Sequence, residues 1–411
     1  MSHIDTNEFG CEIPYRRIGV DYYKEVTFYD IWKSPKKTLV PWKKGEITQD
    51  HGGGVLNRIP KFDSSVIRPS NNDYQATIDG MYNWYSPFNH TPYSGEVTPD
   101  MIPNSLYVLN HVFGEQIEQG IKYMKLLYEY PERRTYVLCL VSKVRATGKT
   151  TFLNWVNMIF QDNFVMTNIE TLEGPFNSGY VTKNIIAIDE AVSDKTQVVE
   201  KVKSLASGKR VPVNEKYVRG FQLDFFGKII FCSNKEIDFL RVDKEEDRFW
   251  IRRLHLVPKK DYDANIEDKL KAEIPMFLKY LLQQTPLDLT KYRFILTPDE
   301  VFTEDLQKLK ENSRPELYKD LTMFLEEFFN QNEAYSVCYA SPIDIKNKFF
   351  AGDNRKSASY IQKVLNNDFE MLPSEKISRY TPFDEEISKT GKHYTFSRKT
   401  FTESKQDVLP F

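Results

Sequence analysis

The stretch CLVSKVRATGKTTFLNW, residues 139–155, predicts a phosphate-binding loop between a buried strand and a helix. The general pattern of such a loop is G-x-x-x-x-G-K-[ST]. Gly148, Lys149 and Thr150 match its second half, but Lys143 stands where the first glycine is expected. That glycine is needed only if its backbone adopts a positive φ, because otherwise the loop amides still point toward the phosphates. Taken alone, the loop leaves a nucleotide site and a chance occurrence of GKT equally open.

A working loop would give each part of this stretch a role. The phosphates would lie at the N-terminus of the helix TTFLNWVNMIF, where backbone amides and the helix dipole favour anions. Lys149 would reach the β and γ phosphates of ATP, and Thr150 would bind Mg2+. The predicted nucleotide-binding residues are Lys143, Val144, Arg145, Ala146, Thr147, Gly148, Lys149, Thr150 and Thr151.

Two adjacent carboxylates follow the next apolar run, IIAIDEA. An acid at the carboxyl end of a parallel strand lies at the edge where open α/β sheets bind ligands. We expect Asp189 to hold Mg2+ and Glu190 to polarise the attacking water. The alternative is a pair of acids at a solvated turn.

Asn234 and Arg248 complete the predicted catalytic set. Asn234 ends the apolar run GKIIFCSN and could orient the lytic water or sense the γ phosphate, although asparagine is also common at turns. Arg248, in EEDRFWIRRL, could stabilise transition-state charge in a neighbouring subunit. Arg252 and Arg253 are weaker candidates for that role, and a surface salt-bridge cluster is the alternative.

The spacing of apolar residues predicts an α/β fold. The short, almost uninterrupted runs TYVLCLVS, NIIAIDE and GKIIFCSN are typical of strands buried on both faces of a parallel sheet. Upstream, residues 104–128 carry apolar side chains at helical spacing, which predicts one amphipathic helix. After the sheet, further helical segments precede a basic unit of mixed pattern.

Composition excludes several classes of protein. The 411 residues are 40% hydrophobic and 28% charged, with 56 Lys and Arg against 58 Asp and Glu, so contact with nucleic acid requires a local basic patch. The sequence has no run of about 20 apolar residues and no secretion signal, which predicts a cytoplasmic protein without a membrane partner. The four cysteines lie far apart, so we expect neither zinc nor structural disulfides. Cys139 and Cys232 lie in the predicted buried strands.

In their order, the loop lysine, paired acids, strand-end asparagine and arginine resemble the compact AAA+ core of superfamily 3 helicases. More closely, LVSKVRATGKTTFLNW, IAIDEA, IIFCSN and EDRFWIRR, with VPWKKGEITQDHG and IPKFD upstream, look like phage primase-helicases of Bacteroidetes phages and related mobile elements. The similarity spans residues 15–255. In that family the first loop glycine is commonly absent, whereas Ala146 departs from a glycine that relatives often carry.

The resemblance also implies a hairpin, within residues 207–223, that projects into the channel of a hexameric ring. Its sequence, SGKRVPVNEKYVRGFQL, combines basic side chains with an aromatic ring, which suits a single nucleic-acid strand. A solvated hairpin is the alternative. The predicted DNA-binding residues are Lys209, Arg210, Lys216, Tyr217 and Arg219, with Lys216 as the leading contact.

We therefore expect four parts: residues 1–103, an α+β region of unknown role; 104–258, an AAA+ P-loop ATPase core; 259–315, a helical connector or lid; and 316–411, a winged-helix-like domain. In the last part, residues 357–367 would form the recognition-type helix and 379–396 the wing, for contact with DNA or with protein. The basic side chains that could face phosphates are Lys356, Lys363, Arg379, Lys392 and Arg398.

The predicted function is ATP- and Mg2+-dependent unwinding of single-stranded or forked DNA by a homohexameric ring. The resemblance implies 3′ to 5′ polarity and the cytoplasm of a bacterial host. About 100 residues before the core are too few for a catalytic primase, so a primase partner would be encoded separately. The rival is an AAA+ nucleotide switch that loads DNA or initiates replication without unwinding. A small-molecule kinase is disfavoured by the paired acids and the late arginine.

Overall fold

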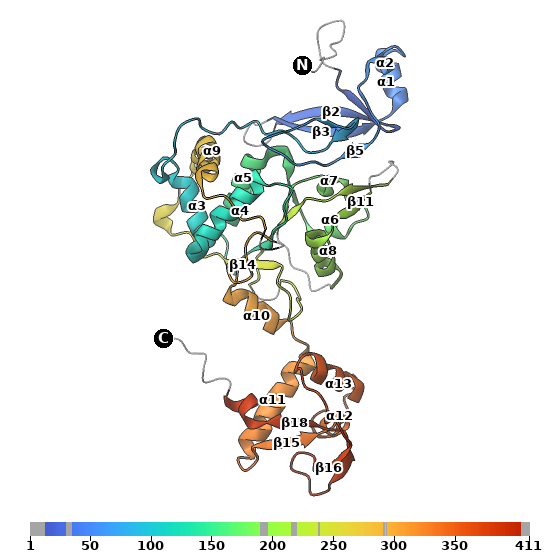
Figure 1. Ribbon diagram of the computed structural model, residues 1–411, viewed down its shortest axis with the longest axis vertical. Coiled ribbons are helices and arrows are strands. Elements are labelled where there is room, and N and C mark those ends of the chain that lie inside the picture. Colours follow the sequence, from blue (N-terminus) through green and yellow to red (C-terminus); the bar gives the residue numbers. More distant parts are fainter. Residues whose placement is uncertain are drawn as a thin grey trace. The chain divides into compact units, whose positions relative to one another are not determined.

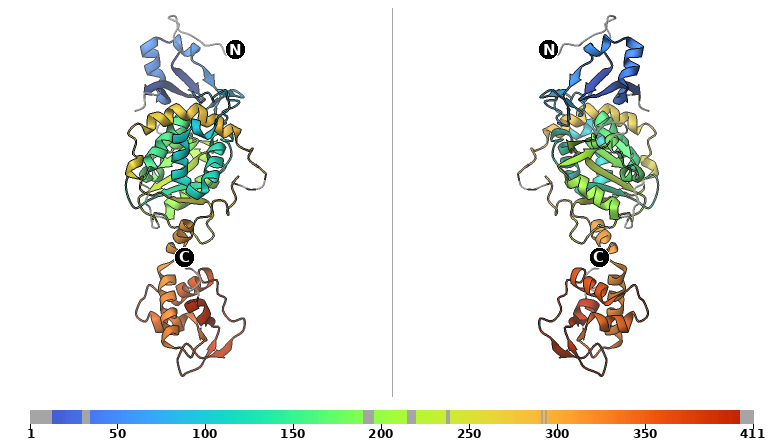
Figure 2. Two further views of the ribbon diagram at one scale, coloured as in Figure 1. Left: turned by 90° about the vertical axis from the view of Figure 1, so that its left-hand side faces the viewer. Right: turned by 90° about the vertical axis from the view of Figure 1, so that its right-hand side faces the viewer.

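The structure is a computed structural model that describes residues 13–29, 35–189, 196–214, 220–236, 239–290, 292 and 294–403. The chain divides into two compact units, Met1–Val242 with Glu246–Leu309 and Asp243–Glu245 with Lys310–Phe411 (Figure 1; two further views in Figure 2). The apolar side chains of each unit form buried clusters of their own. The four-part division expected from the sequence stays a prediction.

A five-stranded parallel sheet forms the centre of the first unit, as predicted. The strands β8, β10, β13 and β14 are fully or largely buried, which explains their uninterrupted apolar runs, whereas the edge strand β9 is partly exposed. Along the sheet the order is β14-β8-β13-β10-β9, so β13 lies between the strand before the phosphate loop and the strand before the paired acids. The bounds are β8 Val137–Val141, β9 Phe164–Thr167, β10 Ile185–Ile188, β13 Lys228–Ser233 and β14 Phe249–Arg253.

Helices cover both faces of this sheet (Figure 1). Leu138 and Leu140 pack toward one face, whereas Val137, Cys139 and Val141 pack toward the other, as the two-residue period of a strand requires. The first face carries α3 Pro103–Phe113, α4 Ile117–Glu129, α5 Lys149–Phe160 and α9 Ile266–Gln283. The second carries α6 Ile169–Glu173, α7 Ser178–Val181, α8 Thr196–Ser207, part of α10 Glu304–Asn312, and the hairpin of β11 Arg210–Val213 and β12 Phe221–Asp224.

The single helix expected over residues 104–128 is wrong in one respect. Gly114 has a φ of +48° and ends α3, and the short 3-10 turn η2 Gly114–Gln116 separates α3 from α4. A positive φ breaks the helical hydrogen-bond pattern, and glycine adopts it without a Cβ clash. The apolar spacing continues across the break because both helices pack on the same cluster.

The N-terminal part of the first unit contains two small sheets. The first has the strand order β3-β2-β1-β4, and the second has the order β5-β7-β6. The bounds are β1 Tyr15–Ile18, β2 Asp21–Tyr29, β3 Pro35–Trp42, α1 Lys44–His51, α2 Val55–Arg58, β4 Lys61–Phe62, β5 Ser65–Val66, β6 Thr77–Ile78 and β7 Met81–Asn83. Short 3-10 turns, η1 Pro99–Met101, η3 Gln161–Asn163 and η4 Lys259–Asp261, complete the unit.

The second unit combines three helices with two pairs of antiparallel strands, β15-β18 and β16-β17. Its bounds are α11 Glu316–Gln331, β15 Val337–Ala340, α12 Pro342–Phe349, α13 Ala358–Asn367, β16 Ser378–Tyr380, β17 Lys389–Gly391, β18 Tyr394–Ser397 and the π-helical turn η5 Lys399–Glu403. Ser357 caps α13 by accepting a hydrogen bond from the Tyr360 amide. The winged-helix interpretation and its nucleic-acid contacts stay predictions.

Candidate nucleotide site

Two residues of the loop between β8 and α5, Ala146 and Gly148, have a positive φ. Gly148 has a φ of +79°, a conformation that favours glycine, and a Cβ there would only touch the His111 ring at 3.4 Å. Lys143 is not among the described residues with a positive φ, which explains why the loop needs no glycine at that position. Ala146, however, has a φ of +58° and takes the conformation for which a glycine is better suited.

Hydrogen bonds connect the loop to the end of β13 and to α3. The Ser142 amide donates to the Ser233 carbonyl over 3.2 Å, which joins the start of the loop to the end of β13. Thr147 Oγ1 donates to Ser142 Oγ over 3.2 Å, and the Thr147 carbonyl accepts from His111 Nε2 at 2.9 Å. The N-cap residue of α5 is Gly148, which has no side chain to cap the first amides of the helix.

Lys149, the first residue of α5, reaches the tip of β13. Its Nζ donates to Asn234 Oδ1 over 2.9 Å, to the Ser233 carbonyl over 3.1 Å and to Ser142 Oγ. Burial lowers the pKa of the Lys149 ammonium, while the nearby Cys232 and the Asp189 carboxylate act in the opposite direction. Burial makes an unpaired ammonium group unfavourable. The negative charge of an anionic ligand at this point would therefore stabilise the charged form of Lys149.

Asp189 follows β10 directly and lies at the same edge of the sheet. β10 and β13 are parallel, with Ile188 beside Phe231, so their carboxyl ends bring Asp189 and Asn234 to one edge. The Asp189 amide donates to the Thr167 carbonyl at the end of β9, over 3.2 Å. Its side chain lines a cavity of about 690 Å³ bordered by β9, α6 and α7. Glu190 lies outside the described residues.

Thr150 and Asp189 are the predicted oxygen ligands for a divalent cation. Thr150 is exposed in the first turn of α5, beside the lysine that contacts the tip of β13. With the Asp189 carboxylate, its hydroxyl has the chemistry that Mg2+ prefers. The residues present therefore fit the predicted cation, although its binding stays a prediction.

A second cavity beside the loop was missed by sequence reasoning. It has a volume of about 700 Å³ and is bordered by α3, the loop at Ala146 and Gly148, and residues 257–266. Tyr107 and His111 project from one side of α3 with their rings stacked, 6.3 Å apart and inclined by 12°. The aromatic pair at spacing i, i+4 was the available signal, but nothing in the sequence indicates that residues 257–266 return to it.

Arg248 lies at the opposite edge of the sheet from Lys149. β14 is parallel to β8, with Phe249 beside Val137, so Arg248 stands at the amino end of the strand. Its Nε is 3.5 Å from the buried Glu246 carboxylate, whose other oxygen is 3.4 Å from Lys203 Nζ. Within one chain Arg248 is therefore remote from the loop.

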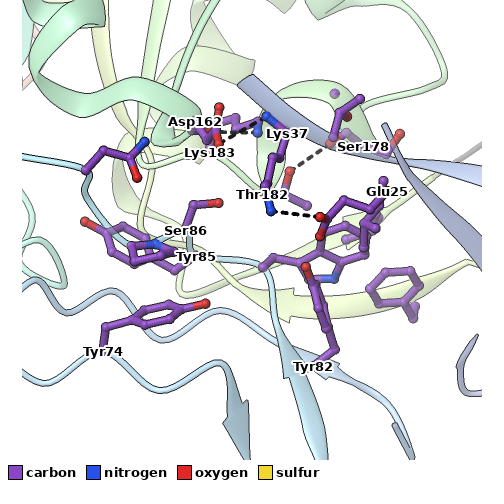
Figure 3. Close-up of a pocket in the computed structure, with 18 residues that line it drawn as sticks. Glu25, Lys37, Tyr74, Tyr82, Tyr85, Ser86, Asp162, Ser178, Thr182 and Lys183 are labelled. Carbon is purple, nitrogen blue, oxygen red and sulfur yellow. Dashed lines mark hydrogen bonds and ion pairs between the residues drawn. The ribbon is translucent and has the colours of Figure 1, made fainter. Parts of the chain in front are cut away.

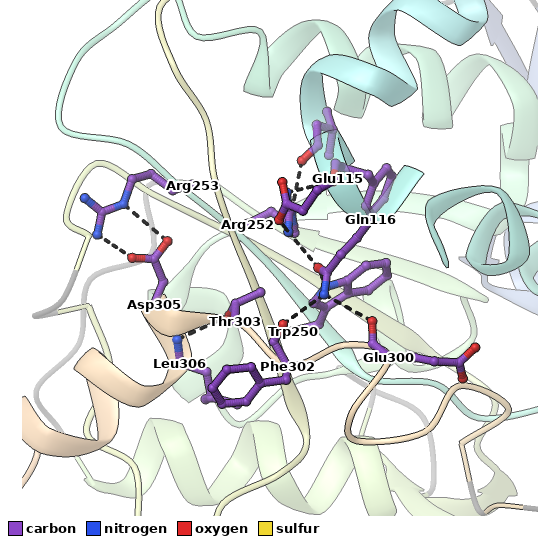
Figure 4. Close-up of polar contacts among 12 residues, drawn as sticks. Glu115, Gln116, Trp250, Arg252, Arg253, Glu300, Phe302, Thr303, Asp305 and Leu306 are labelled. Carbon is purple, nitrogen blue, oxygen red and sulfur yellow. Dashed lines mark hydrogen bonds and ion pairs between the residues drawn. The ribbon is translucent and has the colours of Figure 1, made fainter. Parts of the chain in front are cut away.

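The two later arginines have partners within the chain (Figure 4). Arg252 is buried, and its guanidinium donates to the Val112 and Phe113 carbonyls over 3.2 and 2.7 Å, at the end of α3. Arg253 pairs with Asp305 at 2.5 Å and with Glu236 at 2.9 Å. These bonds assign Arg252 to the packing of α3 against β14.

The predicted hairpin is present as β11 and β12, which pair antiparallel. Lys209 and Arg210 are exposed at its base, where Arg210 Nε donates to Asp224 Oδ1 over 2.9 Å. Lys216, Tyr217 and Arg219 lie outside the described residues. The roles assigned to the hairpin and to the nucleotide site stay predictions.

Comparison with known proteins gives a fold but no established activity. A model of a family of unknown function, DUF5906, matches residues 140–253, from β8 to the end of β14. No curated protein matches the sequence. Among the described residues, no helix combines the length and the apolar content that crossing a membrane requires.

Solved structures are similar over most of the chain. An apo structure of the NrS-1 C-terminal region is 14% identical with a TM-score of 0.59, covering 90% of this chain and 95% of that one. An A-form apo structure of the same region is 15% identical with a TM-score of 0.61, covering 90% and 96%. This chain therefore shares the fold of the NrS-1 C-terminal region.

Proposed function

We propose that this chain is an ATP-dependent DNA helicase of superfamily 3, from a phage or mobile element, that moves along single-stranded DNA. One observation carries the proposal: Lys149 Nζ lies 2.9 Å from Asn234 Oδ1 at the tip of β13, and Asp189 directly follows the neighbouring strand β10. A loop lysine, a strand-end amide and a strand-end acid thus meet at the edge where α/β sheets bind ligands.

The residues divide the chemistry of ATP hydrolysis among them. The amides at the start of α5 and the Lys149 ammonium bind the phosphates and stabilise negative charge on them. Thr150 and Asp189 would hold Mg2+, which would supply positive charge to neutralise the charge that develops on the phosphates. Glu190 accepts a proton from the attacking water, and Asn234 orients that water.

The cavity beside the loop supports ATP as the ligand. Its volume of about 700 Å³ adjoins Gly148 and Thr151, and its wall includes the Tyr107 and His111 rings. A planar base can stack on such rings while its phosphates extend into the loop. We assign this cavity to the adenine and ribose.

The place of Arg248 supports a ring of subunits. An arginine at the far edge of the sheet can act on ATP only in another copy of the chain. We therefore propose a homohexamer, with Arg248 of one subunit at the γ phosphate of the next. The hairpin residues Lys209, Arg210, Lys216, Tyr217 and Arg219 would line the channel and bind the strand.

The polarity of 3′ to 5′, the bacterial host cytoplasm and a separately encoded primase partner follow from the family resemblance alone. The fold shared with the NrS-1 C-terminal region supports a helicase-related protein of replication. The polarity, the host and the separate primase are parts of the proposal.

Two lysines of the same loop provide the first test. Lys149→Ala should lower ATP turnover by at least about 100-fold, since a preorganised charge at the phosphates is lost. Lys143→Ala is the matched control. Residue 143 would contribute its backbone amide to the loop, and the substitution keeps that amide. The Lys143 side chain is 76% exposed and its ion pair with Glu236 spans 3.5 Å, so turnover should stay close to wild type. Normal turnover in the Lys149 variant would refute the assigned site.

A hairpin variant distinguishes the helicase from the alternative function, a nucleotide switch. Lys216→Ala should retain ATP binding and lose unwinding of a forked duplex, measured by strand separation. An unchanged unwinding rate contradicts the hairpin assignment. Wild-type protein that hydrolyses ATP and binds DNA without separating strands would favour the switch.

Mixed rings test the role of Arg248. Arg248→Ala and Glu190→Ala proteins are each inactive if both residues are essential, but a mixture places an intact Arg248 opposite an intact Glu190 at some interfaces. Partial recovery of ATP turnover on mixing is expected. No recovery at any ratio argues against action across subunits.

A further inference from the structure

A third cavity lies between the N-terminal strands and the sheet domain, away from the nucleotide site. It has a volume of about 550 Å³, within the range of about 300 to 1,000 Å³ typical of ligand pockets. Residues of β2, β3, the segment 74–89, α7 and the hairpin strands line it (Figure 3). Neither the nucleotide site nor the subunit contacts proposed above use it.

Aromatic rings form much of its wall. Tyr74, Tyr82, Trp84, Tyr85 and Phe221 all border the cavity. The Tyr82 and Trp84 rings are fixed edge to face, with centroids 5.3 Å apart and planes inclined by 81°. Trp84 Nε1 is buried, and among the residues that the structure describes it has no hydrogen-bond partner. The wall therefore offers aromatic rings for stacking.

The charges around the cavity balance each other. Glu25 and Asp162 contribute carboxylates, and Lys37 and Lys183 contribute ammonium groups. Lys37 Nζ donates to Glu25 over 2.9 Å, and the half-buried Lys183 Nζ donates to the Asp162 carbonyl over 2.7 Å. Because the charged side chains that line the cavity are two acids and two lysines, the lining carries no excess of positive charge for a phosphate group. It suits a neutral, planar ligand that carries its own donors and acceptors.

The cavity is joined to the base of the hairpin. Val213 and Phe221, at facing positions of β11 and β12, contribute to its wall. Asn177, at the start of α7, donates to the Pro212 carbonyl over 2.8 Å and accepts from the Asn214 amide over 2.7 Å. The α7 side of the cavity is thereby held in place relative to the hairpin strands.

We propose that this cavity binds one unstacked nucleobase. Stacking on aromatic rings binds any base, and the paired carboxylates, amines and hydroxyls around the cavity can meet the polar edge of the base. A base could come from a single strand or from a free nucleoside, and the adjoining hairpin favours the strand. The inference concerns binding in the absence of ATP, so it stands or falls separately from the ATPase assignment.

The test uses the full chain and an oligothymidylate with one 2-aminopurine, whose fluorescence falls when it stacks on an aromatic side chain. Tyr74 is partly exposed outside any helix or strand, so Tyr74→Ala should leave the fold intact. It should raise the Kd by roughly 5- to 150-fold, the range for loss of one base–aromatic stack, and weaken the quenching. Tyr74→Phe keeps the ring and should restore both.

Tyr93→Ala is the matched control, because Tyr93 lies in the same unit, is 44% exposed and does not line the cavity. It should bind the strand as wild type does. Equal affinity and quenching in the Tyr74→Ala and wild-type proteins would overturn the proposal. Competition by 2′-deoxyadenosine at micromolar concentration would support the cavity but identify the free nucleoside as its ligand.

A measurement on the unaltered protein covers the case in which Tyr74→Ala does not fold. A strand carrying 5-iodouracil is irradiated with the wild-type chain, and the crosslinked peptides are identified by mass spectrometry. Crosslinks to Tyr74, Tyr82 or Trp84 support the proposal. Crosslinks confined to other parts of the chain overturn it.

Discussion

Arg252 and Arg248 lie four residues apart, yet the structure predicts opposite consequences for their loss. Arg252→Met should destabilise the first unit, because its guanidinium is buried at the end of α3. Arg248→Met should leave stability nearly unchanged and lower ATP turnover, if Arg248 acts on a neighbouring subunit. Methionine keeps most of the aliphatic stem in both cases, so the comparison isolates the charged group.

The size of the effect follows from the partners of each side chain. Arg252 donates to two backbone carbonyls of α3 and to Gln116 Oε1 at 2.6 Å, whereas its partner Glu115 is 77% exposed and contributes little. Breaking such a buried set costs about 3 to 5 kcal/mol when one side is left unpaired. Arg248 is 31% exposed and lies 3.5 Å from the Glu246 carboxylate, which also pairs with Lys203 and therefore keeps a partner, so the loss of Arg248 should cost about 1 kcal/mol or less.

Tryptophan fluorescence during urea unfolding measures this difference. All five tryptophans belong to the first unit, so the signal does not report on the second. The Arg252→Met transition should move to lower urea by the equivalent of about 3 kcal/mol, with the Arg248→Met transition close to wild type. A loss below about 1 kcal/mol for Arg252→Met would refute the buried-network reasoning. A larger loss for Arg248→Met would refute the contrast.

Three further predictions concern other sites. Residue 146 has a φ of +58°, so in urea unfolding Ala146→Gly should leave stability within about 1 kcal/mol of wild type, whereas Ala146→Val should cost about 1 to 3 kcal/mol. Equal stabilities of the two variants contradict this prediction. Burial lowers the pKa of Lys228 to about 7, so above pH 7 the unfolded chain binds more protons than the folded chain. The free energy of unfolding should therefore rise from pH 7 to 9 by on the order of 2 kcal/mol relative to Lys228→Met. A difference between the two proteins that does not change with pH contradicts this prediction. Asp344→Asn should destabilise the second unit by about 2 to 4 kcal/mol, because Asp344 accepts a hydrogen bond from Tyr380 over 2.7 Å and pairs with Lys389 at 2.6 Å. Calorimetry measures the loss, and ATP turnover should not change. An unshifted unfolding transition contradicts a stabilising role for Asp344.

The sheet and its edge were predictable because their signals are local. Runs such as VLCLV and KIIFCS indicate strands buried on both faces, and the carboxyl ends of parallel strands meet at one edge. Asp189 and Asn234 therefore come together as the sequence suggested. Cys139 and Cys232 are fully buried in β8 and β13, as expected.

The rest depended on contacts between distant segments. The break at Gly114 was missed because the apolar spacing of α3 continues into α4. Arg252 resembled a candidate for action in trans, since nothing in RFWIRR shows that its partners lie at the end of α3. The cavity at Tyr107 and the cavity at Tyr74 are each assembled from segments far apart in the chain.

The adjacency of β10 and β13 has a consequence for how this protein could diversify. The chain leaves β10 at the edge that carries Asp189, forms α8 and the β11–β12 hairpin, and re-enters the sheet at Lys228 beside Ile185. This inserted segment begins after the buried strand β10 and ends at the buried strand β13. The pairing register of these two strands does not depend on the length of the segment between them. The hairpin can therefore gain, lose or exchange residues at its tip while the geometry around Lys149 stays the same. If the hairpin binds the strand and the loop hydrolyses ATP, as proposed, substrate preference and catalytic rate can change independently.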